Sequence, residues 1–246
     1  MKVLLWLPLF LFVACNRTAP PETDTAATQA PAPAATSAPP ATTSAAEPAA
    51  PRVNGPKLMP LDAATDDPAL VAYRDALLSA VKSHDIEAVI ALVDPKIRTS
   101  FGGGGGAGNL RHSLEQPGNW NDLEQVLSLG GTFQGEGADR SFWAPYVYSA
   151  WPEAHDAFAS LAVVAADVPL HETPDPNGPV VATLSYDIVT IADQPTTKPG
   201  AFRQVKTADG HTGWVESSKV RSPVGYRAGF LKQDGKWRMN ALVAGD

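Results

Sequence analysis

Apolar positions that follow residue 67 recur with the period of an α-helix. Asp67 and Pro68 come first, and this pair is typical of a helix start, because aspartate caps free backbone N–H groups and proline fits the first turn. The apolar residues that then share one helical face are Leu70, Tyr73, Leu77, Leu78 and Val81. The pattern predicts an amphipathic helix that begins at Pro68.

The rest of the first half shows the same period twice more. A second helix is expected from about Asp85 to the Asp94-Pro95 pair. A third is expected to be capped by Asn119 or Asn121 and to end at Gly130-Gly131. Residues 97–101 predict a brief strand, and the glycine run that follows, residues 102–106, is interpreted as a loop between elements. The first half is therefore expected to be mainly helical.

The second half changes to short β-rich segments separated by turn residues. These segments are residues 162–168, 180–184, 187–192, 202–207 and 213–216. Near the end of the chain, Asp234-Gly235 stands between two strand-like runs. This dipeptide predicts a hairpin, because both central residues of a tight hairpin turn need a positive φ.

Part of this half resembles a known family. The segments that carry the resemblance are residues 168–174, 180–184 and 202–218, and the most specific piece is Asp209-Gly-His-Thr-Gly-Trp-Val215. They are similar to bacterial SH3-type domains, and the resemblance implies a small β-barrel. His171 and Phe202 depart from the family pattern, which has arginine and often tryptophan there. The final strand pair also resembles that of cone-shaped α+β folds of the nuclear-transport-factor-2 type.

The expected fold class is α+β: a helical N-terminal domain, then a small SH3-like β-barrel and a C-terminal β-hairpin, all after a disordered linker. The expected boundaries are a signal peptide at 1–14, a tether at 15–60, the mainly helical domain at 61–165, the barrel at 166–222 and the hairpin at 223–246. The tether is expected to be disordered because it is almost all Ala, Pro and Thr, a composition that cannot bury a core.

The first fifteen residues have the order of a secretory leader. Lys2 precedes an apolar run of eleven residues, 3–13, which is shorter than the roughly 20 residues of a membrane-spanning helix. Ala14 and Cys15 follow, and Cys15 is the only cysteine in the chain. This junction resembles the lipobox of bacterial lipoproteins. The resemblance implies cleavage before Cys15 and attachment of diacylglycerol and palmitate to it; an ordinary secretory peptide is the alternative.

The same resemblance implies a location and a first partner. Lipid on Cys15 would hold the protein in a membrane of the cell envelope. Asn16 stands where such lipoproteins carry Asp when they stay in the inner membrane. The outer membrane, facing the periplasm, is therefore expected rather than the inner membrane.

Composition excludes several functions. Loss of the leader removes Lys2 and leaves 18 Lys and Arg against 26 Asp and Glu, a net charge of −8, so no nucleic-acid partner is expected. With one cysteine, the mature chain has neither an internal disulfide nor a free cysteine nucleophile. None of the five histidines has another within five residues, so no metal site and no cofactor are predicted.

Aromatic residues supply the candidate ligand contacts. Four of them cluster within nine residues and the others belong to the expected barrel groove: Trp143, Tyr146, Tyr148 and Trp151, then His171, Tyr186, Phe202 and Trp214. Flat rings of this kind stack on sugars and on extended chains. The competing interpretation is that they pack in the core.

These observations lead to one functional hypothesis and two alternatives. The first is a non-catalytic envelope protein whose barrel binds peptidoglycan or a periplasmic protein, with no catalytic residue. The second is a cell-wall hydrolase that uses Asp or Glu residues such as Asp122, Glu124 or Asp139, which would have to face one another across a cleft. The third is an assembly or inhibitor lipoprotein that binds its partner through the helical domain.

Overall fold

The computed structural model describes residues 50–116, 118–192 and 200–245. The expected leader, Cys15 and the tether as far as residue 49 lie outside the described residues. The three predicted helices are present as α1 (Pro68–Lys82), α2 (Ile86–Leu92) and α4 (Asn119–Ser128). The predicted start of α1 is confirmed, because Asp67 Oδ1 accepts hydrogen bonds from the backbone N–H groups of Ala69 and Leu70 at 3.0 and 3.2 Å.

Two further helices were not predicted. They are α3 (Ala107–Leu114), which follows the glycine run, and the short α5 (Tyr146–Ser149). Single-turn 3₁₀ helices complete the set: η1 (Ala63–Asp66), η2 (Gly137–Asp139) and η3 (Ser217–Lys219). None of the described helices is long and apolar enough to cross a membrane.

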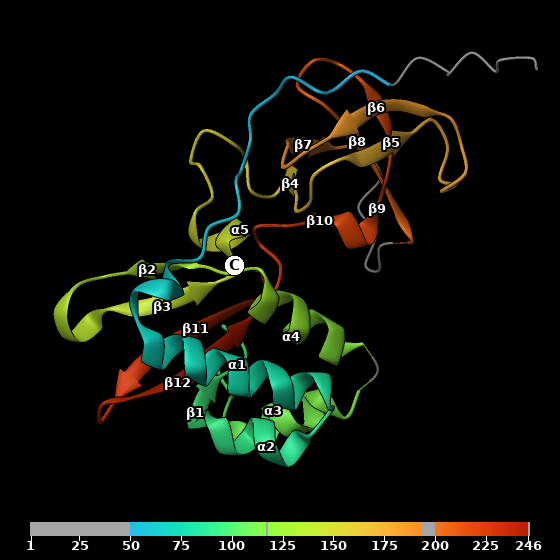
Figure 1. The fold of residues 1–246 in the computed structure, drawn as a ribbon. Coiled ribbons are helices and arrows are strands. Elements are labelled where there is room, and N and C mark those ends of the chain that lie inside the picture. Colours follow the sequence, from blue (N-terminus) through green and yellow to red (C-terminus); the bar gives the residue numbers. More distant parts are fainter. Residues whose placement is uncertain (1–49, 117, 193–199, 246) are drawn as a thin grey trace, which may run out of the picture. The chain divides into compact units, whose positions relative to one another are not determined.

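A five-stranded sheet supports these helices. Its strands, in spatial order, are β1 (Val93–Arg98), β12 (Lys236–Val243), β11 (Arg227–Gln233), β3 (Ser141–Ala144) and β2 (Thr132–Gln134). β1 runs parallel to β12, and the other neighbours are antiparallel. Helices α1–α4 lie on one face of the sheet (Figure 1), and their side chains share a core with it that includes Leu70, Phe142 and Phe230.

The second sheet has seven strands. Their spatial order is β10 (Val220–Arg221), β4 (Ser160–Val163), β7 (Ile188–Ile191), β8 (Phe202–Lys206), β9 (Thr212–Glu216), β5 (Val168–His171) and β6 (Val180–Leu184). All neighbours pair antiparallel. A separate core that includes Leu161, Leu170 and Val215 lies within this half.

The expected fold class is wrong in both of its main parts. The helices do not form a domain of their own, because β2 and β3 from the first half join the C-terminal hairpin in one sheet. The SH3-like barrel is not formed either: β10 and β6 are the edges of the second sheet, and no pairing between described residues joins them. The apolar helix faces need a surface to cover them, and strands next to the helices in sequence supply it together with the C-terminal hairpin.

The last part of the predicted tether is also ordered. Residues 51–60, here called the N-terminal segment, lie along the second sheet. Val53 N donates to Thr183 O at 3.0 Å, and Thr183 N donates to Pro51 O at 2.8 Å, so the segment pairs with β6. Val53 and Leu58 are buried. Backbone hydrogen bonds and two buried apolar side chains therefore order this segment, which composition alone did not indicate.

Candidate functional site

The predicted aromatic residues fall into three separate places. Trp143 and Tyr148 form the first, with ring centroids 5.6 Å apart. Trp143 lies flat over Gly229, where an added Cβ would be 2.9 Å from the ring. The guanidinium of Arg227 lies between two rings, with its Cζ 4.6 Å from the Tyr148 centroid and 5.1 Å from that of Phe101. The rings of this group are therefore occupied largely by one another and by arginine.

His171, Phe202 and Trp214 form the second place, on adjacent strands of the seven-stranded sheet. His171 pairs with Trp214 across β5 and β9, and its ring meets Phe202 edge-on at 6.2 Å. His171 is buried, and its Nδ1 lies 3.0 Å from Gly178 O. Trp214 and Phe202 are half-buried. The structure brings these three predicted residues together, around a histidine whose polar atom already has a backbone partner.

Tyr146, Trp151 and Tyr186 form the third place, where α5 approaches the second sheet. Tyr146 and Trp151 belong to a small apolar cluster with Leu58 and Ile188. Trp151 Nε1 donates to His155 O at 2.9 Å. Tyr186 has a positive φ of 57°, and its carbonyl accepts from Leu58 N. Tyr146 also lines a cavity.

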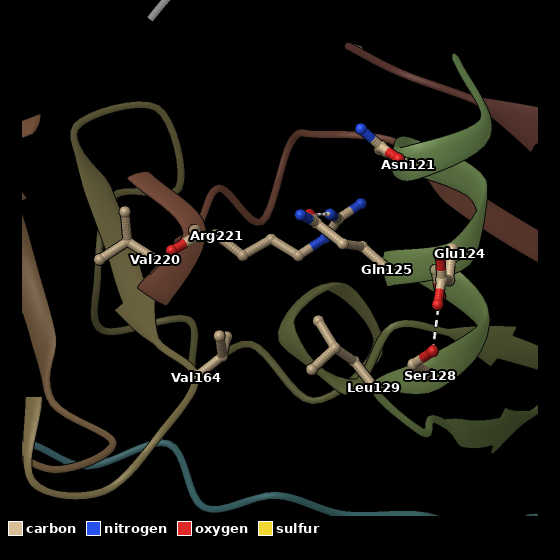
Figure 2. Close-up of a pocket in the computed structure, with 9 residues that line it drawn as sticks. Asn121, Glu124, Gln125, Ser128, Leu129, Val164, Val220 and Arg221 are labelled. Atoms are coloured by element: carbon tan, nitrogen blue, oxygen red, sulfur yellow. Dashed lines mark hydrogen bonds between the residues drawn. The ribbon is translucent and has the colours of Figure 1, made fainter. Parts of the chain in front are cut away.

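That cavity belongs to a groove that sequence reasoning missed. It consists of two adjoining cavities of about 270 and 260 Å³, which share Ser128, Leu129 and Val164 as lining residues. We call the pair the α4 groove, because one wall is formed by α4 and the other by residues next to β4 and β10. Figure 2 shows the first cavity, with the Arg221 side chain reaching from β10 to Gln125 on α4.

Arg221 closes one end of the α4 groove. The residue is only 8% exposed, and its guanidinium donates to Gln125 Oε1 and to Tyr226 O, both at 2.8 Å. Both acceptors are neutral, and no described carboxylate forms an ion pair with Arg221. Its Nε is buried without a hydrogen-bond partner among the described residues. Burial lowers the pKa of Arg221, while the nearby Asp122 carboxylate counteracts this. An arginine nevertheless keeps its charge in a protein.

Tyr146 lies at the other end, in the second cavity with Leu61 and Gly130. It is 1% exposed, and its hydroxyl has no hydrogen-bond partner in the described part of the chain. Burial, with a smaller contribution from Tyr186, raises the pKa of Tyr146 to about 12, so the hydroxyl remains a donor at neutral pH. A buried polar group without a partner costs about 1–3 kcal/mol.

The acidic residues proposed for hydrolysis do not face each other. Asp122 and Glu124 are two positions apart on α4, so their side chains point about 200° apart around the helix axis. Glu124 lines the first cavity of the groove, and Asp122 lines a different cavity, which Arg221 also lines. Burial raises the pKa of Asp122, and Arg221 partly offsets this. Asp139 lies in η2, between β2 and β3.

The described residues do not support a metal site or a phosphate-binding glycine loop. No three His, Cys, Asp or Glu side chains among them are grouped so as to hold a metal ion. The glycine run connects β1 to α3, where Gly105 forms a bridge with Arg98. Gly103, Gly104 and Gly106 have positive φ values of 87°, 79° and 92°, which explains the glycines by backbone geometry.

The residues of the groove gave no signal in the sequence. Arg221 follows one valine in a two-residue strand, and a lone arginine there is normally solvent-exposed. Its burial depends on α4, which lies almost a hundred residues earlier. Tyr146 was singled out as a ring for stacking, whereas in the structure its hydroxyl is the distinctive atom. Cys15, the predicted lipid site, lies outside the described residues.

Comparison with known proteins leaves the chain without a family. No model of a protein family and no curated protein matches it. The similar solved structures include a protein of unknown function with a cystatin-like fold from Nostoc punctiforme, with 11% identity, a TM-score of 0.29 and coverage of 76% of this chain and 94% of that one. An NTF2-like protein of unknown function from Pseudomonas putida has 9% identity, a TM-score of 0.25 and coverage of 75% and 89%.

A function-unknown protein from Mycobacterium tuberculosis is similar at 12% identity and a TM-score of 0.29, with coverage of 73% of this chain and 70% of that one. At TM-scores this low, these similarities assign neither a fold nor an activity to the chain.

Proposed function

We propose that this protein is a lipid-anchored, non-enzymatic binding protein of the bacterial envelope, and that the α4 groove is its binding site for peptidoglycan. The observation that carries the binding part is Arg221, a buried cation in the wall of a cavity with neutral partners only. A buried charge whose hydrogen-bond partners are neutral is costly; the nearby Asp122 carboxylate offsets part of this cost, and an anionic ligand in the cavity would offset more.

The anchoring part depends on the leader. Lys2, the short apolar run and the single Cys15 resemble the lipobox, and two or three acyl chains at about 0.8 kcal/mol per buried CH₂ hold a protein almost permanently. The Ala/Pro/Thr-rich residues between Cys15 and the N-terminal segment would act as a tether from the outer membrane towards the cell wall.

The hydrolase alternative is less well supported by the geometry. Glycoside hydrolysis needs two carboxyl groups on opposite sides of the scissile bond, at about 5 to 9.5 Å from each other. Asp122 and Glu124 point to different sides of α4, and among the described residues Glu124 is the only acid that lines the first cavity of the groove. One acid beside an arginine supports binding rather than this chemistry.

Two measurements test the proposal. Growth with labelled palmitate should label the full chain and leave Cys15→Ala unlabelled; label on the variant would refute the anchoring part. The purified full chain in detergent should sediment with isolated cell wall, and Arg221→Gln should reduce the sedimented fraction. Sedimentation no greater than that of an unrelated acidic protein would refute the binding part.

The assembly-factor alternative predicts a different result. A partner that docks on the helices would be captured by the full chain regardless of Arg221, and the capture would fall when exposed positions on α1 or α2 are changed. Equal capture by the wild type and Arg221→Gln, together with absence of wall binding, would favour that alternative over the proposal.

A further inference from the structure

Arg227 is an arginine with covered faces and an open edge. It is 7% exposed, and its Cζ lies 4.6 Å from the ring centroid of Tyr148 and 5.1 Å from that of Phe101. No described residue forms an ion pair with Arg227 or accepts a hydrogen bond from its side chain. Its nitrogen atoms are also not among the fully buried polar atoms that lack a partner. The N–H groups along the edge of the guanidinium therefore reach solvent.

The fold places this arginine on the face of the five-stranded sheet that is opposite the helices. Along β11, Ala228 and Phe230 belong to the core that the sheet shares with the helices. Successive side chains of a strand point to opposite faces, so Arg227 and Gly229 face the other way. The ring of Trp143 covers Gly229, where an added Cβ would be 2.9 Å from the ring. An aromatic ring therefore fills the space next to the arginine on this face.

The glycine run brings Phe101 to the arginine. Phe101 stands between β1 and the run, residues 102–106, and it is 46% exposed. Gly105 forms a bridge with Arg98, and an added Cβ there would be 2.8 Å from a backbone oxygen of β1. The loop therefore folds back tightly on the end of β1. It holds the Phe101 ring beside the guanidinium and leaves almost half of the residue exposed.

A second cation lies over the same ring. Arg98 is exposed, and its Cζ lies 5.7 Å from the Phe101 centroid. No described carboxylate forms an ion pair with Arg98 either. Two arginines without an ion-pair partner therefore flank one exposed ring, and two cations attract a doubly charged anion more strongly than a singly charged one. A phosphate monoester carries about two negative charges at neutral pH, and its oxygens match the N–H fork of arginine.

We propose that Arg227, Arg98 and Phe101 form a binding site for a phosphate monoester that carries a flat apolar group. The phosphate binds the open edge of Arg227, with Arg98 as the second cation, and the flat group stacks on the exposed part of Phe101. The glycines shape the loop and do not themselves hold the phosphate. None of the three site residues lines either cavity of the α4 groove, so this site is separate from the proposed wall-binding site.

Calorimetric titration of the full chain in detergent at pH 7.5 tests the ligand class. The probes are phenyl phosphate, benzoate and glycerol 3-phosphate. Phenyl phosphate should bind at least about tenfold more tightly than benzoate, which has one negative charge. It should bind about 3- to 10-fold more tightly than glycerol 3-phosphate, whose polar substituent cannot stack on Phe101.

Each probe has an outcome that contradicts part of the inference. Absence of phenyl phosphate binding would overturn the site. Binding of benzoate as tight as that of phenyl phosphate would overturn a phosphate as its ligand. Equally tight binding of glycerol 3-phosphate would overturn the flat apolar group and assign the site to a bare phosphate headgroup.

Arginine variants test the two cations. Arg227→Gln should weaken binding of phenyl phosphate by about 10- to 100-fold, because it removes the charge and its paired N–H groups. Arg98→Gln should weaken it by about 2- to 5-fold, because Arg98 is exposed and screened by solvent. The matched control is Arg140→Gln. Arg140 is also exposed and stacked on a ring, with its Cζ 3.7 Å from the Phe133 centroid, but it lies outside the site and should bind as the wild type does.

Phe101→Ser tests the ring. It should abolish the preference for phenyl phosphate over glycerol 3-phosphate, while glycerol 3-phosphate still binds. Phe158→Ser, at a ring that is 64% exposed, is its control and should keep the preference. Near-ultraviolet circular dichroism would reveal whether Arg227→Gln loses its fold. In that case an unchanged preference in Phe101→Ser, together with unchanged affinity in Arg98→Gln, would overturn the inference.

Discussion

The ion pair between Lys57 and Asp187 is expected to hold the N-terminal segment on the second sheet. Lys57 Nζ lies 2.6 Å from Asp187 Oδ1; the aspartate side chain is 1% exposed and the lysine side chain 36%. The other carboxylate oxygen accepts from Ser185 N at 2.6 Å. Lys57→Met keeps the aliphatic stem but leaves the Asp187 charge buried with only this remaining hydrogen bond.

The size of the effect follows from the unequal burial of the two partners. Breaking a fully buried pair costs about 3–5 kcal/mol, while an exposed pair contributes about 0–1 kcal/mol. With one partner buried and the other one-third exposed, we expect Lys57→Met to lower the free energy of unfolding by about 2–3 kcal/mol. In a folded region of this size that corresponds to a decrease in Tm of about 4–12 °C.

Arg52 provides the matched control. It lies in the same segment and pairs with Asp167 at the same distance, 2.6 Å, but the two side chains are 71% and 66% exposed. Arg52→Met should therefore change the free energy of unfolding by less than about 0.5 kcal/mol. Thermal unfolding of the full chain, followed by circular dichroism, measures both variants. Equal effects of Lys57→Met and Arg52→Met would refute the reasoning that burial sets the strength of these pairs.

Three further predictions concern glycine packing and titration. Gly131→Ala would place a Cβ 2.1 Å from the Trp143 carbonyl oxygen and should cost more than about 2 kcal/mol in a denaturant titration, whereas Gly108→Ala, in α3 with nothing within 4 Å, should stabilise by up to about 1 kcal/mol. Burial raises the pKa of Tyr73 and Tyr146 to about 12, so an absorbance titration should show two tyrosines ionising late, and Tyr146→Phe should remove one of them. Burial also raises the pKa of Asp122, so its ionised form destabilises the folded chain at neutral pH. Asp122→Asn should therefore raise Tm at pH 7, and this gain should shrink as the pH falls towards 3.8, where the wild-type carboxyl is protonated. A gain in Tm that stays constant over this pH range would contradict the prediction.

Local signals in the sequence were reliable where a few neighbouring residues determine the geometry. The Asp67-Pro68 pair begins α1 as expected. Asp234 and Gly235 have φ values of 50° and 77°, which confirms the predicted hairpin turn. The predicted cap of the third helix was wrong, because Gly118 precedes α4 and Asn119 is its first residue. Asn119 instead donates to Ser113, in the preceding helix, a contact that no local pattern specifies.

The predictions of the strands and the barrel were wrong where strands pair with partners that lie far away in the sequence. Residues 162–168 were expected to form one strand, but they divide between β4 and β5, with a turn at Asp167, whose φ is 54°. The similarity of residues 168–218 to a barrel family did not predict that β4 and the N-terminal segment also pair with the seven-stranded sheet. These pairings change which strands are edges, and so the sheet stays open in the part of the chain that the structure describes.

The sequence by itself determined the helices α1, α2 and α4 and the hairpin turn at Asp234-Gly235, because each depends on hydrogen bonds or sterics within a few residues. The lipid on Cys15 stays a prediction. Only the tertiary structure decided that the C-terminal hairpin completes the sheet beneath the helices and that Arg221 is buried against α4. The burial of a side chain depends on the residues that pack against it. Gln125, which packs against Arg221, lies 96 positions earlier in the sequence. The α4 groove therefore forms only when two distant parts of the sequence pack together.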